Sequence, residues 1–421
     1  MLANKYPDNA YLAFDLGASS SRAILGLLNG TRLETEELHR FPTPIISEGE
    51  QLYWDLETLW LELQTGLQRA LNANPRLCSL SVDSWGFDYV PINKEGNPIR
   101  NPYCYRSPRT MGMMDKVLQQ VSASELYEAT GIQFLETNTL SQVLADLEFE
   151  SALYEQTANR IMIADYFNYR FSGRAVAEIS LASTTSLIDV QSRTWAYPLM
   201  QQIGMSTNSW PEIVPSGTVL GSLKTNREVL VIAGCSHDTA CAVAAVPVAP
   251  KSGAWAYLSC GTWSLLGVER TSPILTEVGR QLEFTNEVGL DGSVRFLTNL
   301  TGLWVLQECE REWKQLGQSY DYDTILTEAA AAPDLGILID FDEPCFRFRG
   351  NMQQKILNYC SSKGMAVPEH RGELVRVILS SLASTYQKTL RALSKVIGEQ
   401  IEVLYIVGGG ARNTLRVPVD C

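Results

Sequence analysis

Apolar and polar residues along the first part of the chain alternate in a way that predicts short strands and one helix. Residues 11–28 run apolar on both sides of Gly17, which predicts two strands joined by a tight turn. Leu59–Leu71 has apolar residues at helical spacing and ends before Asn74-Pro75, and Leu77–Val82 then predicts a buried strand. This strand–helix–strand order is typical of an α/β layered fold.

The rest of the chain continues this pattern after a more irregular middle part. Residues 100–230 mix Asn, Ser, Pro and aromatic residues, and we expect helices and loops there. Val229–Ala233 predicts another buried strand, followed by a helix rich in Ala and Val. Leu374–Ile397 predicts a long amphipathic helix that stops at Gly398, and a strand over Ile401–Val407 follows it. The apolar face of this helix is formed by Leu374, Ile378, Leu382, Tyr386, Leu390, Leu393 and Ile397.

The length of the chain indicates two domains. A chain of 421 residues is long for one hydrophobic core. Two prolines and a glycine within residues 246–253 predict the boundary, so we expect domains at 1–247 and 248–421. Each domain then opens with an apolar strand, a glycine (Gly17 or Gly261) and a second strand. Such glycines let backbone N–H groups approach a phosphate, which predicts a polyphosphate held between the domains.

Composition and charge narrow the class of partner. Hydrophobic residues make up 45% of the chain, the net charge is −13, and no cluster of Lys or Arg occurs. Nucleic acid and anionic membranes both need a basic face, so we expect neither as a partner. Residues 1–10 lack the apolar core of a signal peptide, and no stretch is apolar for long enough to span a bilayer. The nine cysteines form no Cys-x-x-Cys pair, which favours a reducing, cytoplasmic compartment.

The first candidate site is the turn that follows Asp15. A carboxylate at the end of a buried strand is well placed to hold Mg²⁺, directly or through water. The alternative is an aspartate that caps its own turn. The hydroxyl-rich segment after the turn favours phosphate binding, with Ala18, Ser19, Ser20, Ser21 and Arg22 as the candidate residues.

The strongest catalytic candidate is Ser236-His237-Asp238-Thr239, which lies between a predicted strand and a helix. Asp238 is expected to accept a proton from an attacking hydroxyl group, a role that contributes about 10²–10⁴ in rate. The alternative is an aspartate that caps the following helix. A serine hydrolase is excluded because three consecutive residues cannot form the nucleophile–base–orienter relay and no Gly-x-Ser-x-Gly occurs.

Two further segments carry weaker signals. Asp83-Ser-Trp-Gly-Phe-Asp88 places two carboxylates and two aromatic rings at a strand end. This pattern favours sugar binding and a packed core with capping aspartates equally. The triplet Gly408–Gly410 follows a strand and could receive a nucleotide's base and sugar. Neither a P-loop nor a Gly-x-Gly-x-x-Gly fingerprint is present.

Taken together, these motifs resemble the FGGY carbohydrate kinases. Asp15–Arg22 is similar to the first phosphate motif of that family, Ser259–Ser264 to the second, and Val407–Asn413 to the adenosine motif. The resemblance runs from about residue 11 to Leu415 and is strongest to the rhamnulokinase subfamily. Further matching segments are Asp83–Asp88, Tyr105–Arg109, Gly131–Leu135, Asn138–Leu140, Asp165–Phe167 and Ser236–Thr239. The family implies an actin-like, ribonuclease H-like two-domain ATPase fold of the α/β class, with the active site in the interdomain cleft.

The resemblance also implies an activity, namely ATP-dependent phosphorylation of L-rhamnulose at O1 in rhamnose breakdown. Asp238 would be the base, and Mg²⁺ would bridge the phosphates near Asp15. Positions that match the family's sugar contacts are Gly86, His237, Asp238, Thr239 and Asn299. Positions that match its nucleotide contacts are Thr262, Gln307 and Gly409. The implied partners are a small sugar and ATP, and we expect a monomer or a homodimer.

Two departures from the family pattern leave alternatives open. Ser21 replaces a glycine that is usual in the first phosphate turn. Only 11 residues follow Gly410, and Arg416–Cys421 does not match the family, so we expect a truncated second domain with exposed apolar surface. The alternatives are a kinase for another ketose or polyol, such as fuculose or xylulose, and a catalytically dead remnant.

Overall fold

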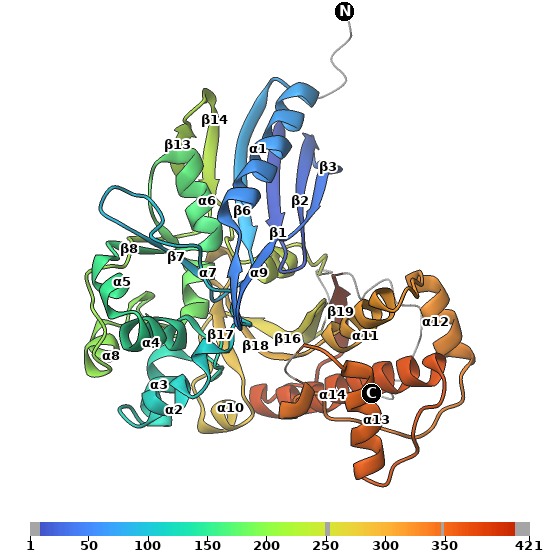
Figure 1. The fold of residues 1–421 in the computed structure, drawn as a ribbon. Helices are drawn as coiled ribbons and strands as arrows, with labels where there is room; N and C mark the ends of the chain where they lie inside the picture. The colour runs from blue at the N-terminus through green and yellow to red at the C-terminus, as the bar shows by residue number, and fades with distance from the viewer. Residues whose placement is uncertain (1–8, 249–252, 347–348, 409–421) are drawn as a thin grey trace, which may run out of the picture. The chain divides into compact units, whose positions relative to one another are not determined.

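The computed structural model describes residues 9–248, 253–346 and 349–408 (Figure 1). Contacts between residues divide the chain into two units. The first unit is Met1–Ala244 with Glu269–Phe296, and the second is Ala245–Val268 with Leu297–Cys421. Each unit therefore contains two separate stretches of the chain, and a domain boundary at residues 247 and 248 stays a prediction.

The first unit contains a six-stranded sheet with the order β13-β14-β6-β1-β2-β3. Its strands are β1 (Ala10–Leu16), β2 (Ser20–Asn29), β3 (Arg32–Pro42), β6 (Leu77–Ser84), β13 (Thr218–Leu223) and β14 (Asn226–Ala233). β1 pairs antiparallel with β2 and parallel with β6, and β6 pairs parallel with β14. The carboxyl ends of β1, β6 and β14 consequently meet at one edge of the sheet, the usual place for functional groups in α/β folds.

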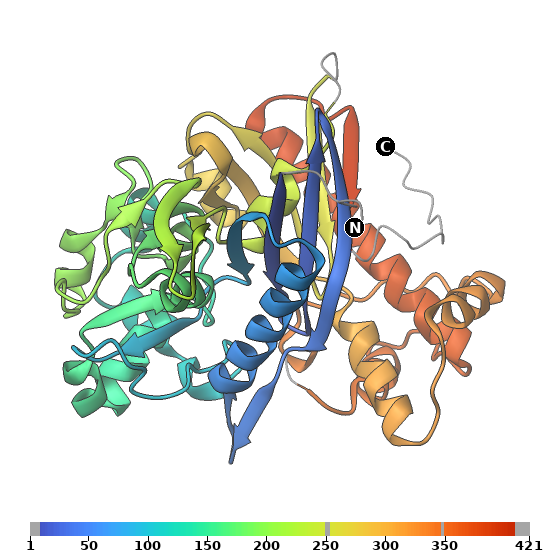
Figure 2. The same ribbon diagram turned by 90° about the horizontal axis from the view of Figure 1, so that it is seen from above.

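Helix α1 (Leu56–Ala73) packs on this sheet at close range. Asp55 caps the helix by accepting a hydrogen bond from a backbone N–H of the first turn, at 3.0 Å. At Gly66, an added Cβ would lie 2.8 Å from both the Phe14 ring and Ala23 Cβ. A glycine is therefore required where α1 meets the strands, and Figure 2 shows the helix running beside them.

The middle of the first unit consists mainly of short helices and loops, as predicted for residues 100–230. Besides α1, the helices of the first unit are α2 (Met113–Leu118), α3 (Ala123–Thr130), α4 (Thr139–Phe149), α5 (Ser151–Gln156), α6 (Ile163–Ser172), α7 (Ile179–Ala182), α8 (Tyr197–Gln202), α9 (Asp238–Ala244) and α10 (Glu277–Gln281). Its short strands are β4 (Ile45–Glu48), β5 (Gln51–Trp54), β7 (Tyr89–Ile92), β8 (Asn159–Met162), β9 (Ala177–Glu178), β10 (Ile188–Asp189), β11 (Thr194–Trp195) and β12 (Ile213–Val214).

A second sheet has five strands in the order β17-β18-β16-β15-β19. The strands are β15 (Trp255–Cys260), β16 (Trp263–Arg270), β17 (Thr285–Val288), β18 (Val294–Thr301) and β19 (Val403–Val407). β15 pairs antiparallel with β16 and parallel with β19. The helices of the second unit are α11 (Trp304–Gln315), α12 (Tyr322–Ala331), α13 (Met352–Ser362) and α14 (Arg371–Ile397).

The predicted long helix is α14, and it ends where the sequence indicated. Gly398 caps it in the left-handed conformation, with φ at 70°. Of the predicted apolar face, Leu374, Ile378, Leu382 and Leu393 are buried, while Tyr386, Leu390 and Ile397 are only half-buried. The strand expected from Ile401 begins at Val403 instead.

Two further findings concern membranes and thiols. In the part of the chain that the structure describes, no helix combines the length and the apolar character needed to cross a bilayer. The cysteines in that part are free thiols, namely Cys78, Cys104, Cys235, Cys241, Cys260, Cys309, Cys345 and Cys360. The cytoplasmic location stays a prediction.

Candidate active site

The first candidate turn joins β1 to β2 at Gly17. A Cβ added at Gly17 would lie 2.7 Å from the backbone oxygen of Ser20, which is too close for any side chain. Ala18 and Ser20 are half-buried and Ser19 is exposed, so the tip of the turn is open to solvent. A glycine here is a requirement of the hairpin itself, whether or not a phosphate binds.

Ser21, the residue that departs from the family's glycine, turns its side chain into the protein. It is 0% exposed, and its hydroxyl lies 2.8 Å from Thr43 Oγ1. The Thr43 hydroxyl in turn donates to the carbonyl of Gly17 at 2.5 Å. The Ser21 hydroxyl thus braces the turn from within, and phosphate binding at this position would use its backbone.

Three carboxylates converge at the carboxyl edge of the first sheet. Asp15 of β1 is paired with Asp83 of β6 in the parallel register, and Asp15 also forms an ion pair with Arg22 of β2. Burial raises the pKa of Asp83 well above its usual range, and the negative charges of Asp15 and Asp238 raise it further. A cation at this edge would relieve the repulsion among the three groups.

The carboxylates at this edge supply only part of the coordination that Mg²⁺ requires. No group of three or more His, Cys, Asp or Glu side chains among the described residues is arranged to hold a metal ion. Mg²⁺ commonly keeps several waters and takes only one or two carboxylates together with substrate phosphates. Asp15 and Asp83 could supply these two carboxylates, because they lie side by side in the sheet and both offer oxygen ligands.

Asp238 is the first residue of α9, directly after the segment that follows β14. Its side chain is 33% exposed, and burial of the rest raises its pKa above the ordinary value. The Thr239 hydroxyl donates to Asp238 Oδ1 at 3.2 Å. A carboxylate with a raised pKa and an exposed oxygen is suited to general base catalysis, because its proton affinity lies nearer to neutral pH.

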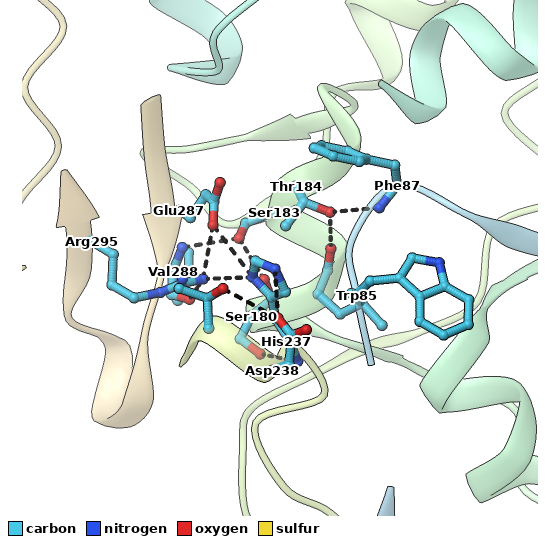
Figure 3. A network of polar contacts seen from close by, with 12 residues as sticks. Trp85, Phe87, Ser180, Ser183, Thr184, His237, Asp238, Glu287, Val288 and Arg295 are labelled. Carbon is cyan, nitrogen blue, oxygen red and sulfur yellow. Dashed lines mark hydrogen bonds and ion pairs between the residues drawn. The ribbon is translucent and has the colours of Figure 1, made fainter. Parts of the chain in front are cut away.

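His237 lies in a polar network next to Asp238 (Figure 3). Its Nε2 is 3.5 Å from Asp238 Oδ1. Its Nδ1 is 3.0 Å from Arg295 Nη2 and 3.3 Å from Glu287 Oε2. Arg295 Nη2 is also 3.0 Å from Glu287 Oε2, so the buried arginine and glutamate neutralise each other.

Two buried acids hold the segment that carries His237 and Asp238. Ser236 Oγ donates to Asp165 Oδ1 at 2.7 Å, and the Ser236 N–H donates to Glu178 Oε2 at 2.9 Å. Burial and the nearby Glu178 raise the pKa of Asp165 to about 7. The Ser84 N–H donates to the Ser236 carbonyl at 2.9 Å and ties the segment to the end of β6.

The Asp83–Asp88 motif divides into two parts with different surroundings. Asp88 is fully buried, and its Oδ2 accepts hydrogen bonds from the indole N–H groups of Trp54, at 2.6 Å, and Trp85, at 3.0 Å. Gln142 donates to its other oxygen at 2.7 Å. Asp88 and Trp85 are therefore tied to each other inside the protein, which favours a structural role for them, and a role of the motif in sugar binding stays a prediction. Gly86 is buried, and an added Cβ would lie 3.2 Å from Thr184 Oγ1.

The second unit has its own glycine turn between β15 and β16. The Leu303 N–H donates to the carbonyl of Gly261 at 2.9 Å, and the Trp304 N–H donates to that of Thr262 at 3.1 Å. A Cβ at Gly302 would lie 2.7 Å from the Gly261 oxygen, so this close approach needs a glycine. The start of α11 thus rests on the turn.

The remaining candidates of the second unit fall on neighbouring elements. Thr262 is half-buried in the turn, Gln307 is half-buried on α11, and Asn299 is half-buried on β18. Gly409 lies outside the described residues, as does the rest of the motif up to Asn413. Their relation to the first unit stays a prediction.

Sequence reasoning missed three residues of the network around Asp238. Asp83 was noted only as part of a motif, although its alignment with Asp15 places it in the acidic cluster. Glu287 and Arg295 come from β17 and β18, and Arg295 follows His237 by 58 residues. No motif includes them. Their one signal in the sequence is that each is a charged residue within a mostly apolar strand, which indicates a buried ion pair.

Comparison with known sequences places the chain in a family. The profile of the N-terminal domain of the FGGY family of carbohydrate kinases matches residues 10–245, and that of its C-terminal domain matches residues 256–417. A rhamnulokinase of Bacteroides thetaiotaomicron is 36% identical over 412 residues, which cover 96% of this chain and 84% of the relative. A rhamnulokinase of Pectobacterium carotovorum is 37% identical over 410 residues, with 96% and 81% covered.

Comparison with solved structures supports the fold. The xylulose kinase from Rhodospirillum rubrum superposes with a TM-score of 0.75 at 16% identity, covering 96% of this chain and 83% of that one. The glycerol kinase of Plasmodium falciparum with ADP gives a TM-score of 0.71 at 14% identity, with 96% and 83% covered. The predicted two-domain α/β kinase fold is confirmed.

Proposed function

The chain belongs to the FGGY family of carbohydrate kinases, and from that membership we propose that it transfers the γ-phosphoryl group of ATP to O1 of L-rhamnulose. The choice of L-rhamnulose as the substrate rests on the similarity to a rhamnulokinase, which is 36% identical over 96% of the chain. The product is L-rhamnulose 1-phosphate, and the location is cytoplasmic.

We assign the role of general base to Asp238. Its carboxylate takes the proton of the 1-hydroxyl group while that oxygen forms the new bond to the γ-phosphorus and the bond to the β-phosphate oxygen breaks. Phosphoryl transfer depends on in-line positioning and on neutralisation of charge rather than on covalent help. The raised pKa and the exposed oxygen of Asp238 support this assignment.

We assign sugar binding to the residues around Asp238. Gly86, His237 and Thr239 lie on segments joined by the hydrogen bond from the Ser84 N–H to the Ser236 carbonyl. We assign Asn299 to the sugar as well, because its position matches a sugar contact of the family. The absence of a side chain at Gly86 leaves room beside Thr184. In this arrangement the imidazole and the hydroxyl groups serve as hydrogen-bond partners for the sugar.

We assign ATP to the two glycine turns. We assign phosphate contacts to the backbone N–H groups of Ala18–Arg22 and to Thr262, and nucleoside contacts to Gln307 and Gly409, because these positions match the motifs of the family. Mg²⁺ held near Asp15 would supply charge neutralisation to the phosphates. Asp83 is the natural second carboxylate for such an ion, because it shares the register position of Asp15.

A coupled ADP-release assay with ATP and Mg²⁺ tests the proposal. L-rhamnulose is compared with L-fuculose, D-xylulose and glycerol, and we expect turnover with L-rhamnulose to exceed the others. Asp238→Asn should lose about 10²–10⁴ in kcat. Asp115→Asn, which changes an exposed carboxylate of α2, is the matched control and should keep full activity.

Each alternative gives a different result in this assay. Preferred turnover of L-fuculose or D-xylulose would identify another ketose kinase. Folded protein that binds sugar by calorimetry but neither binds ATP nor turns over any sugar would identify a catalytically dead remnant. Equal activity in the wild type and Asp238→Asn would remove Asp238 from the role of base.

A further inference from the structure

Arg295 is a fully buried arginine of β18 with unused hydrogen-bonding capacity. It is 0% exposed, and its Nε and Nη1 have no hydrogen-bond partner in the structure. Its Nη2 makes all the polar contacts, namely with His237 Nδ1 and Glu287 Oε2, both at 3.0 Å, and with the Val288 carbonyl at 3.4 Å. A buried guanidinium that directs a single nitrogen at a histidine is a specific arrangement, because burying an arginine is costly.

The contact with Arg295 determines where the proton of the neutral imidazole sits. A guanidinium can only donate, so the Arg295–His237 hydrogen bond requires a lone pair on His237 Nδ1. The proton of the ring must then be on Nε2. Glu287 Oε2 is also near Nδ1, at 3.3 Å, but it lies closer to Arg295 Nη2, which neutralises its charge.

The other ring nitrogen faces Asp238. His237 Nε2 lies 3.5 Å from Asp238 Oδ1, on the side of the ring away from Arg295 (Figure 3). With the proton on Nε2, the ring presents a donor to the Asp238 carboxylate or to a hydroxyl group placed beside it. The opposite tautomer would present a lone pair to a carboxylate and repel it.

We propose that Arg295 is a positioning residue, which holds His237 as the tautomer protonated on Nε2 and thereby keeps a hydrogen-bond donor directed at Asp238. Glu287 completes the device by holding the guanidinium in place. The order of contacts is Glu287, Arg295, His237 and Asp238, and it runs from β17 and β18 to the start of α9. The catalytic part of the inference rests on the proposed function, whereas the tautomer does not.

The backbone of the network is fixed independently, which explains how one tautomer can persist. The His237 N–H donates to Ser180 Oγ at 3.3 Å, and the Val288 N–H donates to Ser183 Oγ at 2.9 Å. Ser180 lies in α7 and Ser183 directly follows it, so one buried segment anchors the backbone of His237 and of the strand that carries Glu287. The backbone of the imidazole and that of the glutamate that pairs with Arg295 are therefore held by the fold.

The direct test is histidine-selective ¹⁵N labelling and a long-range proton–nitrogen spectrum of the wild type. The chain has only three histidines, at positions 39, 237 and 370, and the His237→Gln variant assigns the signals by deletion. We expect a protonated Nε2 and an unprotonated Nδ1 for His237. A protonated Nδ1, or an even mixture of tautomers, would overturn the proposal without any assay of activity.

Two variants then test the role of Arg295. Arg295→Met removes the donor, and the double change Glu287→Gln with Arg295→Met removes both buried charges in case the single variant does not fold. In each we expect His237 to lose its preference for the Nε2 tautomer and kcat to fall by about tenfold or more, because misplaced groups near the reacting atoms are costly. The KM for ATP should change little.

Arg280→Met is the matched control, because it removes an arginine from an exposed ion pair with Glu277. It should leave both the spectrum and kcat unchanged. An unchanged spectrum in the Arg295 variants would refute control of the tautomer. A changed spectrum with unchanged kcat would refute the catalytic part alone, and a wild type without turnover would count against the proposed function but not against the tautomer.

Discussion

Asp15 and Asp83 occupy the same register position in the parallel strands β1 and β6. Paired residues of adjacent strands point to the same face, so these two carboxylates leave the sheet side by side. The pKa of Asp83 is raised well above its usual range by burial and then by Asp15 and Asp238. This repulsion is built into the sheet and is not relieved by Arg22 alone.

The Asp15–Asp83 relationship predicts that Asp83→Asn stabilises the protein near neutral pH. Because the pKa of Asp83 is higher in the folded protein than in the unfolded chain, the unfolded chain releases this proton first, and stability falls as pH rises above about 4. Removing the ionisable group should raise Tm near pH 8, by about 2–4 °C for each kcal/mol gained. Scanning calorimetry measures this, and Asp115→Asn is the exposed control.

The same pair makes a prediction for Mg²⁺ that can be separated from activity. MgCl2 should raise the Tm of the wild type more than that of Asp83→Asn, because a cation relieves repulsion only where both carboxylates are present. An equal rise in both proteins would show that Asp83 takes no part in holding the ion.

Asp88 should behave as a structural residue, unlike its neighbour in the motif. Burial raises its pKa to about 6, although the two indoles, Gln142 and a backbone N–H all hydrogen-bond to it. In Asp88→Asn, an amide N–H must face one of these donors, which should cost about 1.5–3 kcal/mol of unfolding free energy. Urea unfolding followed by tryptophan fluorescence measures the loss, and kcat of the remaining folded enzyme should change little. A large fall in kcat at unchanged stability would reverse this assignment.

Local sequence patterns predicted these elements well because the spacing of apolar residues and a glycine at a turn or helix end define local backbone structure. The alternation around Gly17 became the β1–β2 hairpin, and the helical spacing before Gly398 became α14. The second half of α14 is less buried than its apolar face suggested. Sequence spacing identifies which residues share a face, but the packing partner decides how deeply each one is buried.

The candidate site was predictable only where its residues are neighbours in sequence. His237 and Asp238 stand together in a motif, whereas Arg295 reaches them from β18 through tertiary structure. The register that aligns Asp15 with Asp83 depends on parallel pairing over about seventy residues, which no local pattern encodes. Long-range pairing is therefore where the structure adds most.

The buried acid beneath the catalytic segment predicts a pH dependence of stability. Burial raises the pKa of Asp165 to about 7, so the folded protein holds a proton there that the unfolded chain gives up above about pH 4. The unfolding free energy should therefore fall as pH rises from about 4 through 7. In Asp165→Asn this fall should be smaller, which Tm measured from about pH 5 to about pH 8 would show. A slope identical to that of the wild type would mean that other groups cause the dependence.

The two glycine turns should respond differently to the same substitution. In Gly17→Ala the new methyl group would lie 2.7 Å from the Ser20 backbone oxygen, so the hairpin must shift, at a cost of about 1–3 kcal/mol. In Gly261→Ala the nearest atom is the Trp263 oxygen at 3.6 Å, an ordinary contact, so the fold should accommodate it with a change within about 0.5 kcal/mol.

This contrast separates folding from phosphate binding at the turns. If phosphates approach the backbone at Gly261, then Gly261→Ala should raise the KM for ATP while Tm stays constant, since the methyl group blocks only the ligand. Gly17→Ala should lower Tm and raise the KM together. Thermal unfolding and ATP titration of the same preparations measure both quantities. An unchanged KM in Gly261→Ala would mean that phosphates do not approach the backbone at the second turn, although both turns join two strands through a glycine.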